Sequence, residues 1–576
     1  MRSNPEDFNR INCHTHVFIG DNVPPYLAKT FMSWPLYLIF NTRLLLKVCR
    51  WWFLSKKSPA NWQYQKWHQW LQKLFHSYRD LFGNFPILNV ARSLFNILIS
   101  YHAIIYVTDA VNKFIFGTEN GIHQGIVWLI RNGFLWIPEN ENIKFWVVLF
   151  VFIFIASGRK IIWGLIKRLG ALYISIPDKS TFTFLRRYLN IGRYAYYLHA
   201  CDIYYKLKSQ YAPGTGFVIL PMDMEFMGAG ELKPEGDLAA QMSNLYDIKL
   251  KHPEVFPFVA VDPRRESAGG KPFFRWNAGG NRVTLQDCFM REYLEEKEFS
   301  GIKIYPALGY YPFDERLLPL WKYAADKGIP IMTHCIAGTI YYRGKKEKAW
   351  NTHPVFETEP GKPLELSEFK NIDFSLNFTH PLNYLCLLEE RLLRRVVAGA
   401  GEKVKDLFGY TNPETPLRRD LSELKICMAH YGGDDQWLKF LDRDRDQFSN
   451  KVISDPETGI DFVKLNESID LSLSRISSLW PWLDWYSIIS SMMIQYENVY
   501  ADISYIDQNP AIYPLLKSTI AHPQLGKKVL FGTDFYVVRN HKSEKEITAN
   551  VEAALSADAF EAIAKRNAVR YLNTLH

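Results

Sequence analysis

Short apolar runs of strand length alternate with amphipathic stretches of helical spacing after residue 200. Helices are expected at about 237–251 and 315–327. One more apolar run, residues 10–17, lies near the start of the chain. The eight expected strands are 10–17, 217–223, 257–263, 301–306, 329–334, 424–430, 498–503 and 529–534. Strands that alternate with helices form a parallel sheet. Eight such units in 576 residues predict an α/β fold, a (β/α)8 TIM barrel.

Polar residues lie at or near the carboxyl ends of these strands. They are His14, His16, Asp223, Asp262, His334, His430 and Asp534. In a barrel, the carboxyl ends of the strands form the face on which active sites are built. We therefore expect these side chains to approach one another at that face.

Four of these residues make a candidate metal site. His14 and His16 share one face of an extended strand, and His334 and Asp534 complete a set of three or four N/O ligands. Imidazole and carboxylate suit Zn, Mn or Fe without a thiolate. His430 is either a further ligand or an acid/base neighbour. Each residue also has a structural interpretation, as a buried histidine, a turn residue or a helix cap, but their joint occurrence at strand ends favours the metal site.

Two long stretches interrupt the strand and helix alternation. Residues 21–200 lie between the first two strands, and residues 338–420 lie between the fifth and the sixth. Both leave the barrel at the carboxyl face, where loops shape an active site. We therefore expect three regions, namely a barrel of residues 1–20 and 201–576, a helical insertion of residues 21–200, and a loop and helix insertion of residues 338–420.

Charge and tryptophan are concentrated in the first insertion. The whole chain has a net charge of +8, but residues 21–200 hold 21 Lys and Arg against 7 Asp and Glu, so the remainder is mildly acidic. The same stretch holds 10 of the 17 tryptophans. The insertion is thus hydrophobic, basic and Trp-rich, and two functional regions are the simplest account.

The cysteines and the N-terminus favour a cytoplasmic protein. The seven cysteines are scattered, odd in number and without a C-x-x-C pair, so no disulfide framework is expected. The first residues are polar and of mixed charge, and no secretory signal is expected from them. With 48% hydrophobic residues, the chain has ample material for a core.

The insertion admits three interpretations. It is a helical lid that packs on the barrel or on a second subunit of a homodimer, a segment that lies in a membrane interface, or a spanning hairpin. Its apolar segments are 34–40, 94–107 and 145–156, and the longest unbroken one has 12 residues where a span needs about 20.

The hairpin interpretation has a topological constraint and a cost. Crossings between two strands of one barrel must be even in number, which a pair formed by 94–116 and 144–166 satisfies. Four charged residues make that pair costly, namely Asp109, Lys113, Arg159 and Lys160. No nucleic-acid partner is expected, because the charges alternate with long apolar runs instead of forming a basic stripe.

Six motifs occur in one order, at 12–16, 301–306, 333–334, 379–381, 428–433 and 531–535. Together they resemble the amidohydrolase superfamily, and more narrowly its amidohydrolase-related branch with the aminocarboxymuconate-semialdehyde decarboxylase group. The resemblance covers residues 8–20 and 214–576. It implies a metal-bearing barrel with His14, His16, His334 and Asp534 as ligands, and His430 as a ligand or acid/base residue.

Three further residues are candidates for the pocket. His380 resembles a family histidine that follows the fifth strand, and its role stays open. Lys303 is expected to have a pocket or structural role, although lysines of the fourth strand are carbamylated and bridge two metals in other branches of the superfamily. Tyr305 follows it two residues later.

The leading hypothesis is a metal-dependent hydrolase with a small-molecule substrate. One divalent ion, Zn before Mn or Fe, would activate water, with Asp534 as the base and His430 as the proton donor. The alternative reaction is non-oxidative decarboxylation of an unsaturated or aromatic acid. The alternative outside enzymes is a membrane-associated binding protein on a degenerate barrel. The expected location is the cytoplasm, with membrane association through residues 21–200 left open.

Overall fold

The structure is a computed structural model. It describes residues 4–30, 36–55, 69–74, 85–138, 140–155, 196–279, 282–336, 340–366, 371–442, 447–535 and 542–574, with a few isolated positions between them. Part of the second expected hairpin helix, 144–166, lies outside the described residues, as do Trp62, Trp67 and Trp163.

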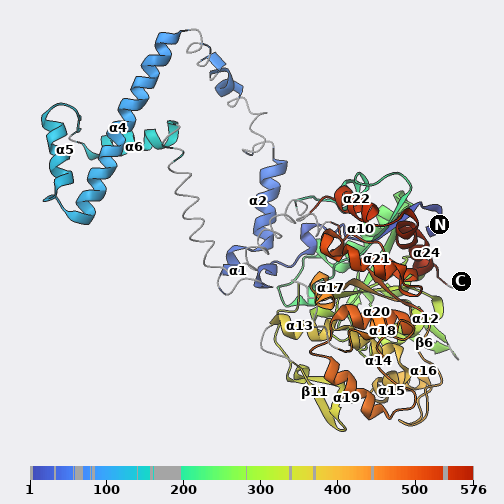
Figure 1. The fold of residues 1–576 in the computed structure, drawn as a ribbon. Helices are drawn as coiled ribbons and strands as arrows, with labels where there is room; N and C mark the ends of the chain where they lie inside the picture. Colours follow the sequence, from blue (N-terminus) through green and yellow to red (C-terminus); the bar gives the residue numbers. More distant parts are fainter. Residues whose placement is uncertain are drawn as a thin grey trace. The chain divides into compact units, whose positions relative to one another are not determined.

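Eight parallel strands form one sheet, in which neighbours along the chain are neighbours in space. They are β1 (Arg10–Thr15), β2 (Thr215–Ile219), β3 (Val255–Val261), β8 (Gly301–Ile304), β9 (Ile331–Ile336), β12 (Ile426–Gly432), β13 (Val499–Asp502) and β14 (Val529–Leu530). Helices surround the sheet (Figure 1). The predicted (β/α)8 barrel is confirmed, because each of the eight expected strands overlaps one of these.

The sheet closes between its first and last strands. The Cys13 amide donates to the Phe531 carbonyl at 2.8 Å, and the His16 amide donates to the Phe535 carbonyl at 2.7 Å. The Asp534 amide donates to the His14 carbonyl at 2.9 Å. Closure therefore brings the N-terminal histidines beside Asp534, although more than 500 residues separate them in the sequence.

Both expected helices are present, although the second begins at Leu318 and not at residue 315. In α10 (Leu238–Lys251), the Asp237 side chain caps the N-terminus by accepting from the Ala240 amide at 2.8 Å. In α12 (Leu318–Lys327), Gly328 ends the helix at a positive φ of 63°. The chain covers the outer face with further helices, among them α17 (Asp434–Leu441), α20 (Trp485–Gln495), α21 (Tyr513–Ala521) and α24 (Asn567–Leu572).

The stretch between β9 and β12 contains strands as well as helices. An antiparallel hairpin comes first, formed by β10 (Thr352–Glu359) and β11 (Lys362–Glu365). The helices α13 (Asn371–Thr379), α14 (Leu385–Leu388), α15 (Glu390–Ala398) and α16 (Glu402–Phe408) come after it.

Contacts within the chain divide it into two units. One comprises Met1–Arg50 and Arg186–His576, and the other comprises Trp51–Leu185. The first residues after β1 therefore belong with the barrel, whereas the sequence alone placed the boundaries at residues 20 and 201. The helix α2 (Thr42–Leu54) crosses the first boundary.

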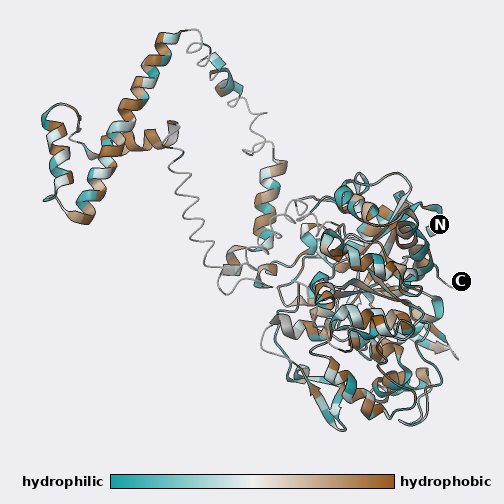
Figure 2. Ribbon diagram, viewed as in Figure 1, coloured by the Kyte–Doolittle hydropathy of each residue, from teal (hydrophilic) through white to brown (hydrophobic). Residues whose placement is uncertain are grey.

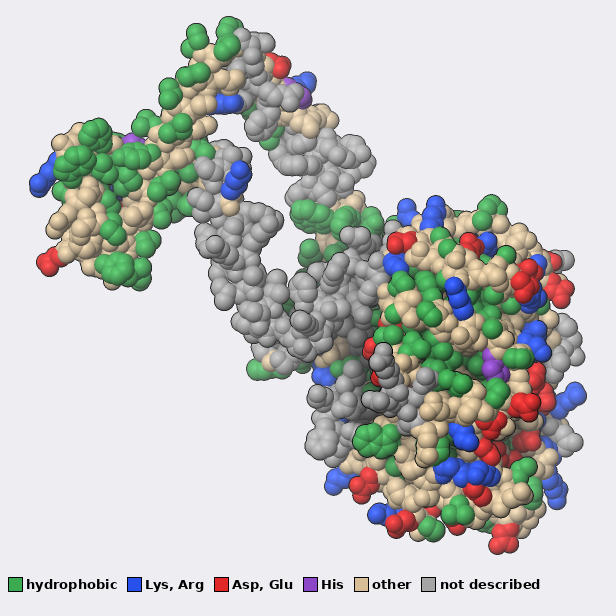
Figure 3. Space-filling view, viewed as in Figure 1, with side chains coloured by type: hydrophobic (Ala, Val, Ile, Leu, Met, Phe, Trp, Pro, Cys, Tyr) green, Lys and Arg blue, Asp and Glu red, His purple; other side chains and the backbone are tan. Residues whose placement is uncertain are grey.

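The second unit is helical and apolar. Its described helices include α4 (Pro86–Phe116), α5 (Gly121–Arg131) and α6 (Glu141–Phe154). Hydrophobic residues colour much of α4 and α6 in Figure 2, and apolar side chains cover much of the surface of these helices in Figure 3. The buried contacts within this unit form two small clusters, one around Ala103 and one around Tyr106.

Candidate metal centre

His14 lies in a β-bulge. Asn12 pairs with Phe217 and Thr15 pairs with Ile219, so three steps along β1 oppose two along β2. A bulge bends its strand and changes the direction of a side chain. Cys13 accordingly packs in a buried apolar cluster with Val218 and Leu530, while His14 joins the polar cluster at the carboxyl end of the barrel.

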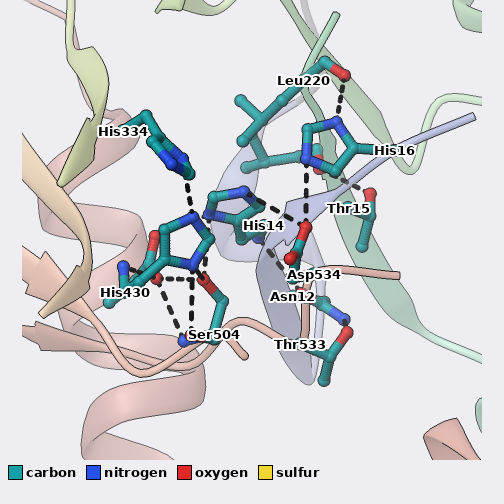
Figure 4. Close-up of polar contacts among 12 residues, drawn as sticks. Asn12, His14, Thr15, His16, Leu220, His334, His430, Ser504, Thr533 and Asp534 are labelled. Carbon is teal, nitrogen blue, oxygen red and sulfur yellow. Dashed lines mark hydrogen bonds and ion pairs between the residues drawn. The ribbon is translucent and has the colours of Figure 1, made fainter. Parts of the chain in front are cut away.

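The protein orients both N-terminal imidazoles by their Nδ1 atoms. The Nδ1 atom of His16 lies 2.8 Å from the Leu220 carbonyl oxygen, which only accepts, so Nδ1 carries the proton. The Nδ1 atom of His14 lies 2.9 Å from Oδ2 of Asp502. In each neutral ring, the lone pair therefore resides on Nε2. Figure 4 shows His16 reaching from Leu220 toward Asp534.

Asp534 faces these lone pairs. Its Oδ1 atom lies 3.2 Å from Nε2 of His16 and 3.8 Å from Nε2 of His14. Asp534 adopts a positive φ of 59°, which is uncommon outside glycine and is typical of functional sites. Gly532 permits this approach, because a Cβ atom there would lie only 2.7 Å from Cβ of His14.

His430 lies in a second bulge. Ala429 pairs with His334 and Gly432 pairs with Ile336, so β12 has one residue more than β9 at this point. His430 itself has a φ of 66°. Its Nε2 atom lies 3.2 Å from Nδ1 of His334, and its Nδ1 atom lies 2.9 Å from Oγ of Ser504. The structure thus brings His14, His16, His334, His430 and Asp534 together.

Sequence analysis missed Asp502 and Ser504. Asp502 ends β13 and is fully buried. Its Oδ1 atom accepts from the His430 and Ser504 amides, each at 3.0 Å, while Oδ2 accepts from His14. One carboxylate therefore holds two of the histidines. Asp502 ends a strand, as the other candidate site residues do, and this position is the signal from which its place in the site could have been predicted.

The donor set fits a divalent metal ion. Ligand atoms at about 2.0–2.1 Å from a tetrahedral zinc lie about 3.3–3.5 Å from one another. The N–O separations of 3.2 and 3.8 Å at Asp534 are close to that spacing. Two groups satisfy the requirement for converging ligand atoms, His14 with His16 and Asp534, and His14 with His430 and Asp502.

Unpaired nitrogens give the same indication. Nε2 of His14 and Nε2 of His334 are buried and have no hydrogen-bond partner among the described residues. A buried polar atom without a partner costs about 1–3 kcal/mol. At His16 and Asp534, Nε2 faces a carboxylate oxygen at 3.2 Å, an arrangement that a metal ion between them would stabilise.

Burial favours the neutral form of the His14, His334 and His430 imidazoles, which is the form that binds metal. It lowers the pKa of His14 and of His334 well below the usual range, and nearby His430 and Lys303 add to the effect at His334. Burial also lowers the pKa of His430 to about 4, with His14 contributing.

Lys303 and Tyr305 adjoin the cluster. The Lys303 amine is buried without a hydrogen-bond partner among the described residues, and burial lowers its pKa to about 8 although Asp502 and Asp534 favour its charged form. The Tyr305 ring stacks on His334 with centroids 4.2 Å apart. Burial raises the pKa of the Tyr305 phenol, with Asp534 adding to the shift.

Three other candidates have partners of their own. Nε2 of His380 lies 3.1 Å from the Trp480 carbonyl, its Nδ1 accepts from the Leu382 amide, and its described contacts include no member of the metal cluster. Asp223 binds Arg265 at 2.8 Å, and Asp262 accepts two hydrogen bonds from the Arg264 side chain, at 2.8 and 2.6 Å.

Solved structures of similar fold carry amidohydrolase-type names. A 4-oxalomesaconate hydratase from Rhodopseudomonas palustris is 15% identical, covers 64% of this chain and 79% of its own, and has a TM-score of 0.31. A putative amidohydrolase from Staphylococcus aureus is 10% identical, covers 64% of this chain and 90% of its own, and has a TM-score of 0.34.

A third structure, amidohydrolase 2 from Bifidobacterium longum subsp. infantis, is 11% identical, covers 66% of this chain and 88% of its own, and has a TM-score of 0.27. No protein-family model and no curated protein matches the chain. At these identities and TM-scores, the similarities carry no argument about function. The functional conclusion therefore depends on the geometry of the site itself.

Proposed function

We propose that the barrel is a metal-dependent enzyme of the amidohydrolase type, with one divalent ion held by His14, His16, His334 and Asp534. The observation that carries the proposal is the pair formed by His16 and Asp534. The Leu220 carbonyl fixes the imidazole so that its lone pair faces the carboxylate at 3.2 Å. A metal ion between the two would satisfy both, and it would also satisfy the unpartnered Nε2 of His14 beside them.

When bound, the ion would polarise a substrate oxygen and lower the pKa of a water molecule. Asp534 presents its carboxylate beside that position and would take the proton from the water. His430 is neutral and buried, and Ser504 and the Asp502 carboxylate fix its ring and backbone. It would take that proton from Asp534 on Nε2 and pass it to the leaving group. Burial of the whole cluster limits competition from bulk water.

Lys303 favours an acidic substrate. Its buried amine is close enough to the carboxylates of Asp502 and Asp534 for both to favour its charged form. A divalent ion and this ammonium against two carboxylates leave a site of net charge +1, which favours one negative charge on the substrate. This charge balance supports decarboxylation of an acid as the second candidate reaction, with Lys303 holding the carboxylate.

The first experiment is a metal count on the full-length protein. We expect about one equivalent of Zn or Mn in the native protein and less than about a tenth in the His16→Asn and Asp534→Asn variants, because each loses a ligand. His353→Asn is the matched control, since His353 is equally buried but bonds to Asn383 at 3.0 Å. A native protein without metal that gains none from added Zn or Mn would overturn the proposal.

The second experiment separates the two reactions. Turnover of candidate amides, esters and unsaturated acids in ¹⁸O-labelled water distinguishes them, because hydrolysis puts the label into a product whereas decarboxylation releases CO2. Full turnover by Asp534→Asn would disprove its role as the base. A metal-loaded protein without any turnover would favour the binding-protein alternative.

A further inference from the structure

The surface of α4 is apolar and exposed. This helix is long and apolar enough to cross a membrane, and only 17% of its most apolar stretch is buried. A core helix of a soluble protein would bury that stretch. Leu98 and Ile104 are each 58% exposed, although they lie near the middle of the helix. Leaving such side chains in water is unfavourable, and an exposed apolar surface of this kind marks a site of interaction.

The buried contacts pair α4 with α6 in opposite directions. Ala103 packs with Val151 and Ile155, and Tyr106, one turn further along α4, lies in a cluster that includes Val147. Val147 and Val148 adjoin both clusters, whereas Val151 and Ile155 join only that of Ala103. The chain therefore runs in opposite senses along the two helices, which cross at an angle in Figure 1.

Charged residues are excluded from both helices where they pair. Residues 93–108 of α4 and 145–158, which begin in α6, carry no Asp, Glu, Lys or Arg. At about 1.5 Å per residue, residues 93–108 of α4 are about 24 Å long and residues 145–154, where α6 ends, about 15 Å, against the ~30 Å hydrocarbon thickness of a bilayer. Asp109, the first charge beyond them, is paired with Lys113 at 2.8 Å and with His123 at 3.2 Å.

The charges beyond the uncharged stretches differ between the two ends. The flanks that connect to the barrel, residues 51–92 and 159–185, hold 11 Lys and Arg against 2 Asp and Glu. Residues 109–144, from the end of α4 through α5 to the start of α6, hold 3 Lys and Arg against 4 Asp and Glu. Anionic lipid attracts basic flanks, and the exposed Trp128 and Trp136 in the connection suit a membrane interface.

Because β1 and β2 belong to one barrel, a chain that crosses a membrane between them must cross back to the same side. β1 and β2 pair directly, from Arg10 with Thr215 to Thr15 with Ile219, although the helical unit lies between them in the sequence. A single crossing would place the two strands on opposite sides of a membrane. The antiparallel partner α6 supplies the return.

We propose that α4 and α6 insert into a phospholipid bilayer as an antiparallel hairpin, with the barrel and both basic flanks at the same face. The partner is lipid with anionic headgroups at that face. The hairpin holds the active site beside the membrane, and it does so independently of the reaction that the barrel catalyses.

Vesicle flotation of the full-length protein tests this. We expect the native chain to float with phosphatidylcholine vesicles that contain some phosphatidylserine, and to resist extraction by high salt and by alkaline carbonate. Leu98→Asp combined with Ile104→Asp should lower the partition into vesicles by at least about a hundredfold, because charges are costly in the hydrocarbon core.

Leu250→Asp combined with Leu465→Asp is the matched control, since these leucines are 66% and 91% exposed on the barrel unit. This control should float as the native protein does. An unchanged metal count in both double variants would show that the barrel remains folded. Trypsin added outside the vesicles should cut in both basic flanks.

Four results would overturn the proposal. They are a native chain that stays in the aqueous fraction, release by high salt alone, unchanged flotation of the Leu98→Asp and Ile104→Asp variant, and protection of one flank but not the other from trypsin. An aqueous dimer that buries α4 would show that the surface pairs with a second copy instead.

Discussion

At the scale of residues, the site depends on a carboxylate that is not itself among the expected ligands. Asp502 accepts from the His14 ring with one oxygen and from the His430 and Ser504 amides with the other. Acceptors of this kind fix the tautomer and the direction of a ligating imidazole. Asp502 thereby orients histidines from two strands that are far apart in the barrel sequence.

Asp502→Asn should weaken metal binding by about 10–100-fold. The Asn side chain has only one oxygen, so either the His14 ring or the backbone N–H groups of His430 and Ser504 lose their acceptor. Titration against a competing chelator measures the affinity. Asp484→Asn is the control, because Asp484 is also buried but caps α20 by accepting from Ser487 at 2.7 Å. Equal affinity in the Asp502 variant would show that this carboxylate does not orient the ligand.

At the scale of elements, two bulges and one close strand contact build the site. β1 and β12 each gain a residue relative to a neighbour, at His14 and at His430. The chain after β14 approaches β1 so closely at Gly532 that no Cβ atom fits without movement, with His14 Cβ at 2.7 Å and Ser504 Cβ at 3.3 Å. Backbone geometry at three strand ends thus sets where the ligands meet.

Gly532→Ala should destabilise the barrel by about 1–3 kcal/mol and also weaken metal binding, because the new methyl group pushes against His14. Denaturant unfolding and chelator titration measure the two effects. Gly401→Ala serves as the control, since a Cβ atom there meets nothing within 4 Å. A Gly532→Ala protein with native stability and affinity would contradict the close contact.

At the scale of the whole molecule, metal binding and the helical unit are expected to be separable. The ligands come from strands at the start, middle and end of the chain, so bound metal ties the barrel together, whereas Trp51–Leu185 forms its own unit. Any ligand that binds only the folded state stabilises it by mass action.

Removing the metal should therefore lower the unfolding temperature of the barrel alone. At a free metal concentration about a hundred times the dissociation constant, the stabilisation is about 2.7 kcal/mol, or about 3 °C for a barrel of this size. Calorimetry of the vesicle-bound full chain with and without chelator measures the shift. His16→Asn should show no shift. A chelator effect of equal size in that variant would mean that the metal binds elsewhere.

The local sequence determined the strands and most of the candidate ligands. Strand-length apolar runs that end in His or Asp are local signals, because burial of a parallel strand demands a continuous apolar run and the residues at its end lie on the carboxyl face. His14, His16, His334, His430 and Asp534 were found in this way. The charge and tryptophan content of residues 21–200 likewise marked a separate region.

Only the tertiary structure decided how these residues meet. The bulges at His14 and His430 depend on pairing with strands about 200 and 100 residues away, which no local pattern encodes. The role of Asp502 and the partners of His380 depend on the same long-range pairing. The packing of α4 on α6 is also a tertiary fact, and the proposed hairpin depends on it. Hydrophobic periodicity follows from each element's own burial, whereas register and direction follow from its neighbours.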